Sequence, residues 1–308
     1  MSEASGIAPA RDSILDAVDA IGDAWSWLIL REAVLHRVDR FGEFQDRLGI
    51  ARSTLTARLN QLDRSGILIH DPQARRYALS PAGEDFFGCL LVAQRWGDRW
   101  RPNVQAALPV THEGTAGARH AVSAILCCTA CGQELRAGEV IAHRGSGAFS
   151  NRVVATRRRT PDLELLERVR PCSIAHTLTV TGDWWSFLII RELFFGVHRF
   201  DDLQRHLGVG PNILSTRLRN LVSLGVVDRV EYQSWPARYE YRLSEKGLDY
   251  YPIPLAVAMW GRRWLPPNPN EPTLTHACGG EVQAVLRCAE CTAEITRQDV
   301  DIVDRWKS

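Results

Sequence analysis

The chain repeats one sequence pattern, and this duplication limits the folds available to it more than any other feature. Gly22–Glu32 reads GDAWSWLILRE and Gly182–Glu192 reads GDWWSFLIIRE, at an offset of 160 residues (182 − 22). Further matches continue at offsets of 159 and 164, and the offset changes where loops are expected. The 308 residues suit two domains of about 150 residues. Because a double-stranded DNA site is itself pseudo-symmetric, a duplicated fold predicts a paired DNA reader.

Composition is that of an ordinary soluble protein, with 45% hydrophobic and 24% charged residues. No apolar run reaches the roughly 18 residues of a membrane span, and residues 1–11 lack the apolar segment of a secretory signal. We therefore expect a cytoplasmic protein with no membrane partner. The formal net charge is only +1, so a basic surface for nucleic acid would have to be local.

Apolar spacing predicts the same order of elements in each copy. In the first copy we expect two helices within residues 13–35 that separate at Gly22, because glycine commonly breaks a helical pattern. The elements expected next are helices at 41–48 and 53–64, strands at 67–69 and 77–79, and a last helix at 82–100. Ser53 and Thr54 suit the N-cap region of the second of these helices, which is expected to begin at Ser53. The order is typical of a winged helix-turn-helix, and the second copy repeats it with a wing longer by 5 residues (164 − 159).

The predicted fold class is mainly α with small β wings, in two tandem winged helix-turn-helix domains. Each domain is expected to be followed by a small β tail that resembles a zinc ribbon. The winged domains are placed at residues 1–105 and 166–268, the tails at 106–144 and 269–308, and a linker at 145–165. The linker assignment depends on its glycine, serine and polar residues.

Several segments of the second copy resemble the HxlR-type winged-helix transcriptional regulators. They are Cys172–Ala175, Gly182–Trp185, Leu188–Leu193, Arg199–Leu203, Ile213–Leu218 and Tyr239–Gly247. The resemblance covers residues 171–266 closely and residues 12–102 more loosely. It implies a cytoplasmic DNA-binding repressor or activator. Those regulators are usually single-domain homodimers, so the tandem fusion departs from the pattern; one chain could supply both heads, and a homodimer of the fused chain stays open.

Residues on the exposed side of each recognition helix and on each wing are the predicted DNA contacts. Hydroxyl, amide and guanidinium groups suit base edges and phosphates. The predicted set is Arg52, Ser53, Thr54, Thr56, Arg58, Arg75 and Arg76 in the first copy, and Asn212, Ser215, Thr216, Arg217, Arg219 and Arg238 in the second. Arg58 and Arg217 match between the copies, and contact with DNA is favoured over an ion pair inside each domain. Because the two recognition helices differ in sequence, the operator is expected to be asymmetric.

The tails carry cysteine and histidine residues at spacings that suit zinc, which takes four tetrahedral sulfur or nitrogen ligands. One structural zinc site is predicted within the second tail, from His276, Cys278, Cys288 and Cys291. A second is predicted within the first tail from His112, Cys128 and Cys131, with His120 or Cys127 as the fourth ligand. Position 114, which aligns with Cys278, is glycine. The alternative is a hairpin with reduced thiols and no metal.

Three further predictions concern single cysteine and tryptophan positions. Cys172 precedes a helix, where a thiolate is favoured, and the resemblance suggests a redox switch there. The matching position of the first copy is Asp12, so a passive thiol is the favoured alternative. Trp25, Trp184 and Trp185 could line a pocket for an aromatic effector, although buried tryptophan is mostly packing. Two tryptophan pairs at helical spacing, Trp96 with Trp100 and Trp260 with Trp264, favour ordinary core packing, and the alternative is that their helices join the copies.

The chain is not expected to be an enzyme, since no Ser/His/Asp set recurs in both copies and no glycine-rich phosphate loop follows a strand. One alternative is a protein that captures a hydrophobic or drug-like molecule without binding DNA. Another is an interaction scaffold that uses the tails.

Overall fold

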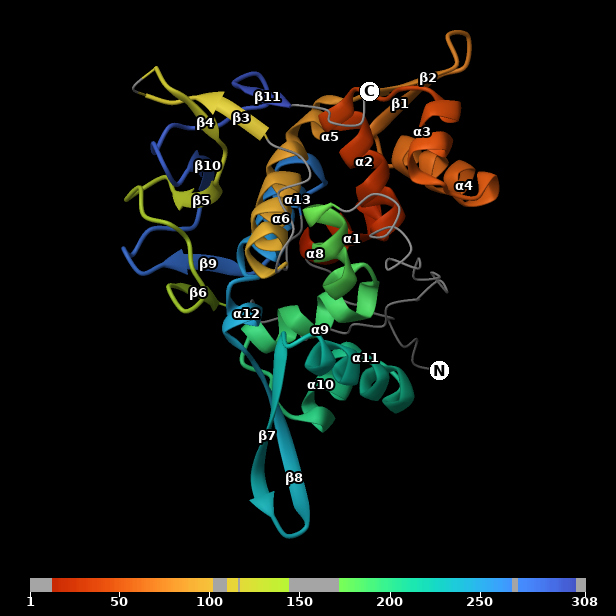
Figure 1. Cartoon of the computed structure of the whole chain (residues 1–308). Coiled ribbons are helices and arrows are strands. Elements are labelled where there is room, and N and C mark those ends of the chain that lie inside the picture. The colour runs from red at the N-terminus through yellow and green to blue at the C-terminus, as the bar shows by residue number, and fades with distance from the viewer. Residues whose placement is uncertain (1–12, 102–109, 116, 144–171, 268–270, 303–308) are drawn as a thin grey trace, which may run out of the picture.

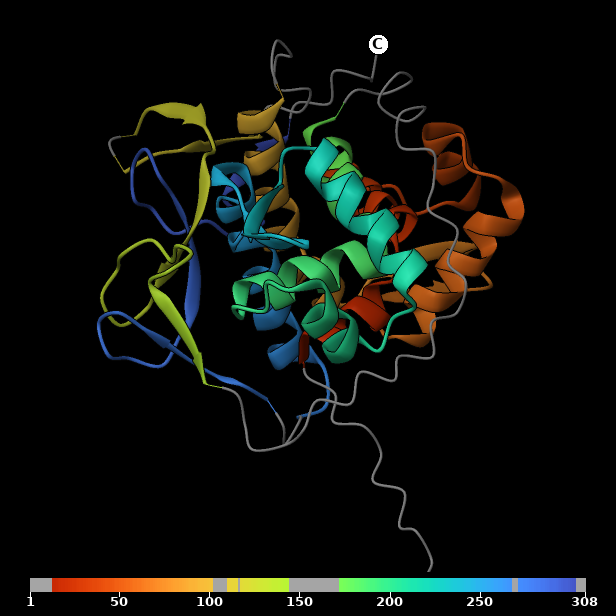
Figure 2. The same cartoon turned by 90° about the horizontal axis from the view of Figure 1, so that it is seen from below.

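The computed structural model describes residues 13–101, 110–115, 117–143, 172–267 and 271–302. The predicted linker at 145–165 lies outside the described residues. Two winged helix-turn-helix heads project from a shared helical centre, and strands of the two tails form a separate layer on the opposite side (Figures 1 and 2). Within the described ranges, no helix has both the length and the apolar character that crossing a bilayer requires.

The first copy follows the predicted order of elements. Its elements are α1 (Ser13–Ile21), α2 (Ala24–His36), α3 (Phe41–Leu48), α4 (Arg52–Arg64), β1 (Leu68–Asp71), β2 (Arg76–Leu79), α5 (Pro81–Asp85) and α6 (Phe87–Trp100). The break between α1 and α2 at Gly22 is confirmed. The single last helix was wrong, because the chain forms α5 and α6 separately. The start of the recognition helix was wrong by one residue: α4 begins at Arg52, Ala51 is its N-cap without a side-chain hydrogen bond, and Ser53 and Thr54 lie in its first turn.

The second copy repeats this arrangement. Its elements are α8 (Ser173–Thr181), α9 (Trp184–Phe194), α10 (Phe200–Leu207), α11 (Pro211–Ser223), β7 (Val227–Ser234), β8 (Ala237–Leu243), α12 (Glu245–Leu248) and α13 (Pro252–Trp264). The longer second wing is confirmed, with strands of 8 and 7 residues against 4 and 4 in the first. In both heads a glycine ends the helix before the recognition helix, Gly49 at φ 59° and Gly208 at φ 61°. Glycine adopts this left-handed conformation without a Cβ penalty.

The two copies pack by exchanging terminal helices. Helix α6 of the first copy lies against α8 of the second, and α13 of the second lies against α1 of the first. The two contacts are equivalent, and each uses a glycine where the backbones approach most closely. A Cβ on Gly97 would lie 2.0 Å from the Ser173 carbonyl oxygen, and one on Gly261 would lie 2.8 Å from that of Ser13.

Tryptophan side chains lock this interface from both sides. The Trp96 indole N–H donates to the Lys246 carbonyl at 3.1 Å, and the Trp260 indole N–H donates to the Ala82 carbonyl at 2.8 Å. Trp100 and Trp264 likewise donate to the carboxylates of Asp249 and Asp85, both at 2.7 Å. The alternative prediction, that these tryptophan-bearing helices join the copies, is confirmed. The chain is therefore a covalent pseudo-dimer with a contact repeated around an approximate twofold axis.

The tails do not form the two separate ribbons that the sequence predicts. Their strands are β3 (Val110–Glu113), β4 (Arg119–Ala121), β5 (Ala124–Cys128), β6 (Val140–His143), β9 (Thr273–His276), β10 (Ala284–Cys288) and β11 (Val300–Ile302). Strand β5 pairs with β10, β6 with β9, and β11 with β3, all antiparallel. These pairs join one tail to the other, because strand edges need backbone partners. The tails thus form one interleaved unit against α6 and α13.

Candidate nucleic-acid interface and Cys/His clusters

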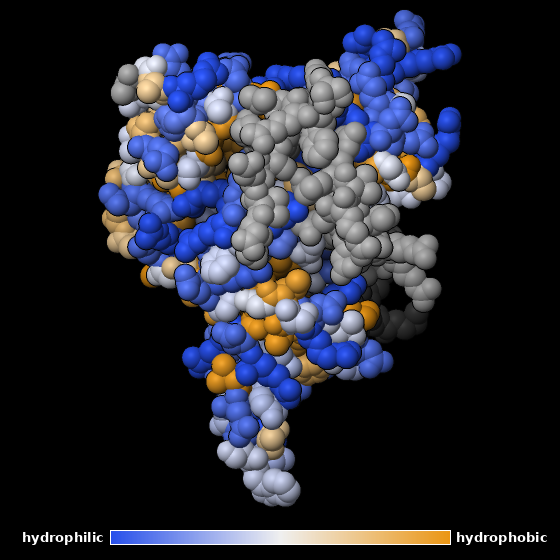
Figure 3. Space-filling model, in the orientation of Figure 1, coloured by the Kyte–Doolittle hydropathy of each residue, from blue (hydrophilic) through white to orange (hydrophobic). Residues whose placement is uncertain are grey.

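The recognition helices α4 and α11 each bury one face and leave the other exposed. Leu55, Leu59 and Leu62 anchor α4 with fully buried side chains, and three leucines at matching positions anchor α11. Both helices lie on the side of the molecule away from the tail strands, and the two wings extend toward opposite ends (Figure 1). The surface over the first head is mainly hydrophilic (Figure 3). Two reading elements are thus available to solvent at separate places on one chain.

Most of the predicted contact residues of these helices are accessible. The exposed ones are Arg52, Ser53 and Thr56 on α4, and Asn212, Thr216 and Arg219 on α11; Thr54 and Ser215 are half-buried. The Thr56 hydroxyl donates to the Arg52 carbonyl at 2.9 Å, and Thr216 donates to Asn212 in the same way at 2.8 Å. Each hydroxyl oxygen keeps acceptor capacity for a base or water.

Arg58 and Arg217 form ion pairs inside their own domains, and not the DNA contacts that the sequence analysis favoured. Arg58 pairs with Asp23 at 2.5 Å, and Arg217 pairs with Asp183 at 3.0 Å. These aspartates are the N-caps of α2 and α9, where their carboxylates accept backbone N–H groups. The Asp23 side chain is only 3% exposed, so its charge needs a cationic partner. The matched arginines therefore tie each recognition helix to its own domain.

The wings present cations of unequal availability. Arg75 is exposed at the first tip, whereas Arg76 pairs with Asp39 at 2.9 Å. On the second wing Arg238 is exposed, and the adjacent Trp235 is 92% exposed. An indole left in water at the end of a long hairpin is unusual, because tryptophan is normally among the most buried residues on average.

The sequence reasoning missed two arginines that lie on aromatic rings beside the second wing. The Arg199 guanidinium lies 4.8 Å from the Tyr232 ring centre, and that of Arg229 lies 3.5 Å from the Tyr239 ring centre. No spacing rule connects Arg199 with Tyr232, because they come from different elements. Such stacking orients a guanidinium while leaving N–H groups free to donate.

In each copy a buried glutamate contacts the helix before the recognition helix. Glu32 on α2 contacts Arg31 and Arg47, both at 2.5 Å, and the equivalent Glu192 contacts Arg191 and His206 at 2.8 and 3.2 Å. Burial alone would raise the pKa of Glu32, but the nearby Arg31, His36 and Arg47 lower it to about 2. Arg47 belongs to α3, so this carboxylate ties α3 to α2.

All eight predicted metal ligands lie in two compact clusters, but their grouping by tail was wrong. One cluster holds His112, His120, Cys288 and Cys291. The other holds Cys128, Cys131, His276 and Cys278. Within each cluster the ligand atoms lie within 4.8 Å of one another. The physical reason is the strand exchange, since pairing β5 with β10 brings the Cys-x-x-Cys turn of each tail to the histidines of the other.

Of the two candidates for the fourth ligand of the first tail, His120 lies in a cluster and Cys127 does not. His120 Nε2 lies 3.4 Å from Cys288 Sγ, whereas Cys127 is in neither cluster. Burial raises the pKa of Cys288, but backbone N–H groups of Ser123, Glu290 and Cys291 and the His120 ring outweigh it and lower that pKa to about 6. A thiol with such neighbours is readily present as the thiolate that metals bind.

Among the cavities described for the placed residues, the three tryptophans predicted to form an effector pocket do not line one together. Trp184 lines a cavity of about 10 Å³, room for roughly one water. Trp25 and Trp185 are not among its lining residues; both are half-buried and pack on the core.

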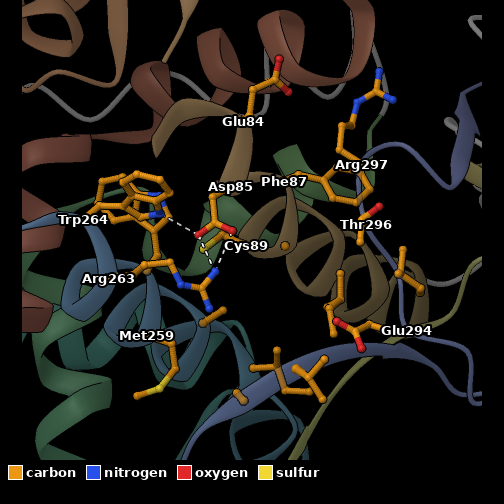
Figure 4. Close-up of a pocket in the computed structure, with 18 of the residues that line it drawn as sticks. Glu84, Asp85, Phe87, Cys89, Met259, Arg263, Trp264, Glu294, Thr296 and Arg297 are labelled. Carbon is orange, nitrogen blue, oxygen red and sulfur yellow. Dashed lines mark hydrogen bonds and ion pairs between the residues drawn. The ribbon is translucent and has the colours of Figure 1, made fainter. Parts of the chain in front are cut away.

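A much larger cavity, of about 750 Å³, lies elsewhere, between α5, α6, α13 and the second tail. We call it the interface groove. Figure 4 shows Arg263 and Trp264 pointing to Asp85 on one side, with Glu294 and Arg297 of the tail on the other. The equivalent position around the approximate twofold axis holds only about 10 Å³. Pro252 and Ile253 stand there, whereas Gly88 and Cys89 line the groove.

Cys172 is the N-cap residue of α8, as its position before the helix predicted. Its side chain is buried, with the residue only 4% exposed, and it interacts with Arg31 of the other copy. An oxidant would have to reach it inside the packing between the copies.

The fold and the exposed helices define a pair of winged helix-turn-helix heads carried by one chain. The model of the HxlR-like helix-turn-helix family matches residues 20–105 and 180–269, which is more than half of the sequence. The chain belongs to this family of helix-turn-helix transcriptional regulators. Both matched regions end where the tails begin.

Two relatives illustrate how one copy compares with a whole protein. An uncharacterized HTH-type transcriptional regulator of Mycobacterium tuberculosis is 42% identical over 140 residues, which are 44% of this chain and 88% of the relative. An uncharacterized HTH-type transcriptional regulator of Synechocystis is 36% identical over 95 residues, covering 30% of this chain and 70% of the relative. Each relative has the length of a single copy, so the duplication distinguishes this chain from them.

Proposed function

We propose that this chain is a sequence-specific transcriptional regulator that binds one asymmetric double-stranded DNA operator with both heads of a single chain. The observation that carries the proposal is the reciprocal packing of α6 on α8 and of α13 on α1. It gives one polypeptide the two-headed form that a helix-turn-helix dimer uses on adjacent half-sites.

The unlike recognition helices support an operator with two different halves. At matching positions the first head carries Arg52, Ser53 and Thr54, and the second carries Pro211, Asn212 and Ile213. An exposed guanidinium suits the guanine edge, and an exposed amide suits adenine. The two halves of the site would therefore differ in sequence.

Binding to random and genomic duplexes across a salt series tests the proposal. We expect affinity to fall steeply as salt rises, through release of counterions from phosphates. Native mass spectrometry should find one chain on each selected duplex. Capture of a hydrophobic ligand with no binding to any duplex would favour the alternative, a sequestering protein.

Matched substitutions on one helix test which end of it meets the DNA. We expect Arg52→Ala, at the start of α4, to weaken binding and to relax base preference in one half-site. Arg64→Ala removes the same charge from the other end of α4, where the side chain donates to the Asn60 carbonyl, and is the control. Equal effects of the two changes would contradict recognition by the start of α4.

The interface groove is the part of the structure that best supports a response to a small-molecule effector. Its lining comes from α6 and α13, which join the copies, so an occupant would contact the elements that set the relation between the heads. Gly88→Leu would place a side chain in this space, where a Cβ meets nothing nearer than Leu286 at 4.0 Å. An effector that raises the melting temperature of the natural chain should fail to do so for G88L. An equal rise in both would place the effector elsewhere.

A further inference from the structure

We propose that the two Cys/His clusters are structural zinc sites, each completed only by ligands from both tails, so that metal binding joins the two copies of the chain. This inference is independent of DNA binding. It also differs from the sites that the sequence predicts, each of which would lie within one tail.

The distances within the clusters fit a tetrahedral zinc ion. Zinc–sulfur bonds of about 2.3 Å and zinc–nitrogen bonds of about 2.05 Å imply ligand separations of about 3.8 Å for S···S, 3.6 Å for S···N and 3.3 Å for N···N. Cys128 and Cys278 Sγ lie 4.0 Å apart, and the Cys131 Sγ to His276 Nδ1 distance is 3.4 Å. In the other cluster, His112 Nε2 lies 3.6 Å from Cys291 Sγ and 3.0 Å from His120 Nε2.

Groups outside the clusters orient the histidines as groups around metal ligands commonly do. The second ring nitrogen of His120 lies 3.3 Å from the Ala118 carbonyl oxygen. The second ring nitrogen of His276 lies 4.0 Å from a carboxylate oxygen of Glu139. The Ala118 carbonyl is within hydrogen-bond distance and favours the His120 tautomer that leaves the other nitrogen free for the metal, whereas Glu139 only lies near the His276 ring.

The two clusters differ in one ligand, which is His120 in one and Cys278 in the other, and Gly114 leaves room for the His120 ring. Copy-related positions supply three ligands to each cluster, but Cys278 corresponds to Gly114 in the first tail. A Cβ at Gly114 would lie only 2.6 Å from His120 Cε1. The missing side chain at 114 thus makes room for the His120 ring, which replaces the cysteine. One site is Cys2His2 and the other Cys3His.

Each site takes two ligands from each tail and therefore cross-links distant parts of the chain. His112 and His120 lie beside Cys288 and Cys291, and Cys128 and Cys131 lie beside His276 and Cys278. The tails are the unit that packs on α6 and α13, so fixing the tails steadies the helices between the heads. A site closed by four protein ligands has a structural role.

Metal content of the intact chain is the first test. We expect two zinc ions per chain, released by a mercurial that blocks thiolates, and a lower melting temperature after release. Cobalt(II) in place of zinc should give the intense visible bands of tetrahedral coordination with thiolate. A chain grown with ample zinc that holds no metal and takes up no cobalt would overturn the proposal.

Paired substitutions test whether the sites cross between tails. Cys278→Ala with Cys291→Ala removes one ligand from each proposed site, so both metals should be lost. His120→Ala with Cys291→Ala affects one proposed site only, so one metal should remain. Sites within single tails would give the opposite result, with one metal lost in the first variant and both in the second.

Two further variants test whether metal loss results from removal of a ligand or from loss of folding. Cys127→Ala removes a buried thiol next to a proposed ligand and should keep two metals. His120→Cys should keep its metal and strengthen the sulfur-to-cobalt absorption of that site. Loss of metal in Cys127→Ala, or an unchanged cobalt spectrum in His120→Cys, would contradict the assignment.

Discussion

Replacing Gly97 with alanine tests the helix exchange that makes one chain a two-headed unit. The new Cβ would lie 2.0 Å from the Ser173 carbonyl oxygen and 2.6 Å from its carbonyl carbon. Ordinary contact begins near 3.4 Å, so α6 and α8 would have to separate by about 1.4 Å (3.4 − 2.0) along this contact. A backbone carbonyl cannot rotate away as a flexible side chain could.

The expected cost follows from two opposing terms. Overpacking of a tight contact costs about 1–3 kcal/mol or more, and the large displacement places this site at the upper end. Alanine gains up to about 1 kcal/mol over glycine inside a helix. We therefore expect Gly97→Ala to destabilise the chain by roughly 2 kcal/mol or more. Gly261→Ala should cost less, because its Cβ meets the Ser13 carbonyl oxygen at 2.8 Å and needs a shift of only about 0.6 Å (3.4 − 2.8).

Urea unfolding followed by circular dichroism measures these differences. Gly42→Ala is the matched control, because Gly42 lies in helix α3 and its Cβ would meet nothing within 4 Å. It should leave stability unchanged or raise it slightly. A Gly97→Ala chain as stable as the natural one would refute the close packing of α6 on α8. A cost for Gly261→Ala above that for Gly97→Ala would refute the reasoning from distance.

Three other substitutions test separate parts of the structure. Arg58→Ala should lower the free energy of unfolding by about 1–3 kcal/mol, because Asp23 stays buried without its cation; stability equal to that of Arg64→Ala in urea unfolding would contradict this. Because the pKa of Glu32 is lowered from 4.5 to about 2, its charge stabilises the fold above about pH 4.5, and this contribution is lost as pH falls toward 2. An acid titration of Glu32→Gln should therefore show a shallower loss of stability over that interval, and an identical slope would count against it. Trp235→Ala should leave the urea midpoint unchanged, since the side chain is 92% exposed. It should weaken DNA binding several-fold, because the second wing is expected to contact the duplex. Unchanged affinity would show that this tip does not contact DNA.

The secondary structure of the heads could be predicted because it depends on local patterns. Leucines at helical spacing mark the inner face of α4, and Gly49 ends the helix before it. These signals act over a few residues. The same signals recur in the second copy, where Gly208 ends α10 and buried leucines line α11. Boundaries that depend on tertiary contacts were less accurate, as the separation of α5 from α6 shows.

The roles of Arg58 and Arg217 could not be predicted from their own helix. From the sequence, an arginine on the outer side of a recognition helix could contact DNA or form an ion pair within its domain equally well. The choice depends on Asp23 and Asp183, which lie more than 30 residues away and reach the arginines only after folding. The match between the two copies indicated that an arginine is needed at this position, but it did not show what the arginine contacts.

The sequence alone determined that this chain has two winged heads, the order of helices and strands within each, and which eight cysteine and histidine side chains can serve as metal ligands. Only the tertiary structure decided how these ligands combine, because β5 pairs with β10, β6 with β9 and β3 with β11, and each of these pairs joins one tail to the other. It also decided which helix each of α6 and α13 meets, α8 for α6 and α1 for α13, with Gly97 and Gly261 at the close contacts. Helices and turns are set by neighbours along the chain. Which tail strand pairs with which, in two similar halves, depends instead on the arrangement that buries the most apolar surface and satisfies the most backbone hydrogen-bonding groups.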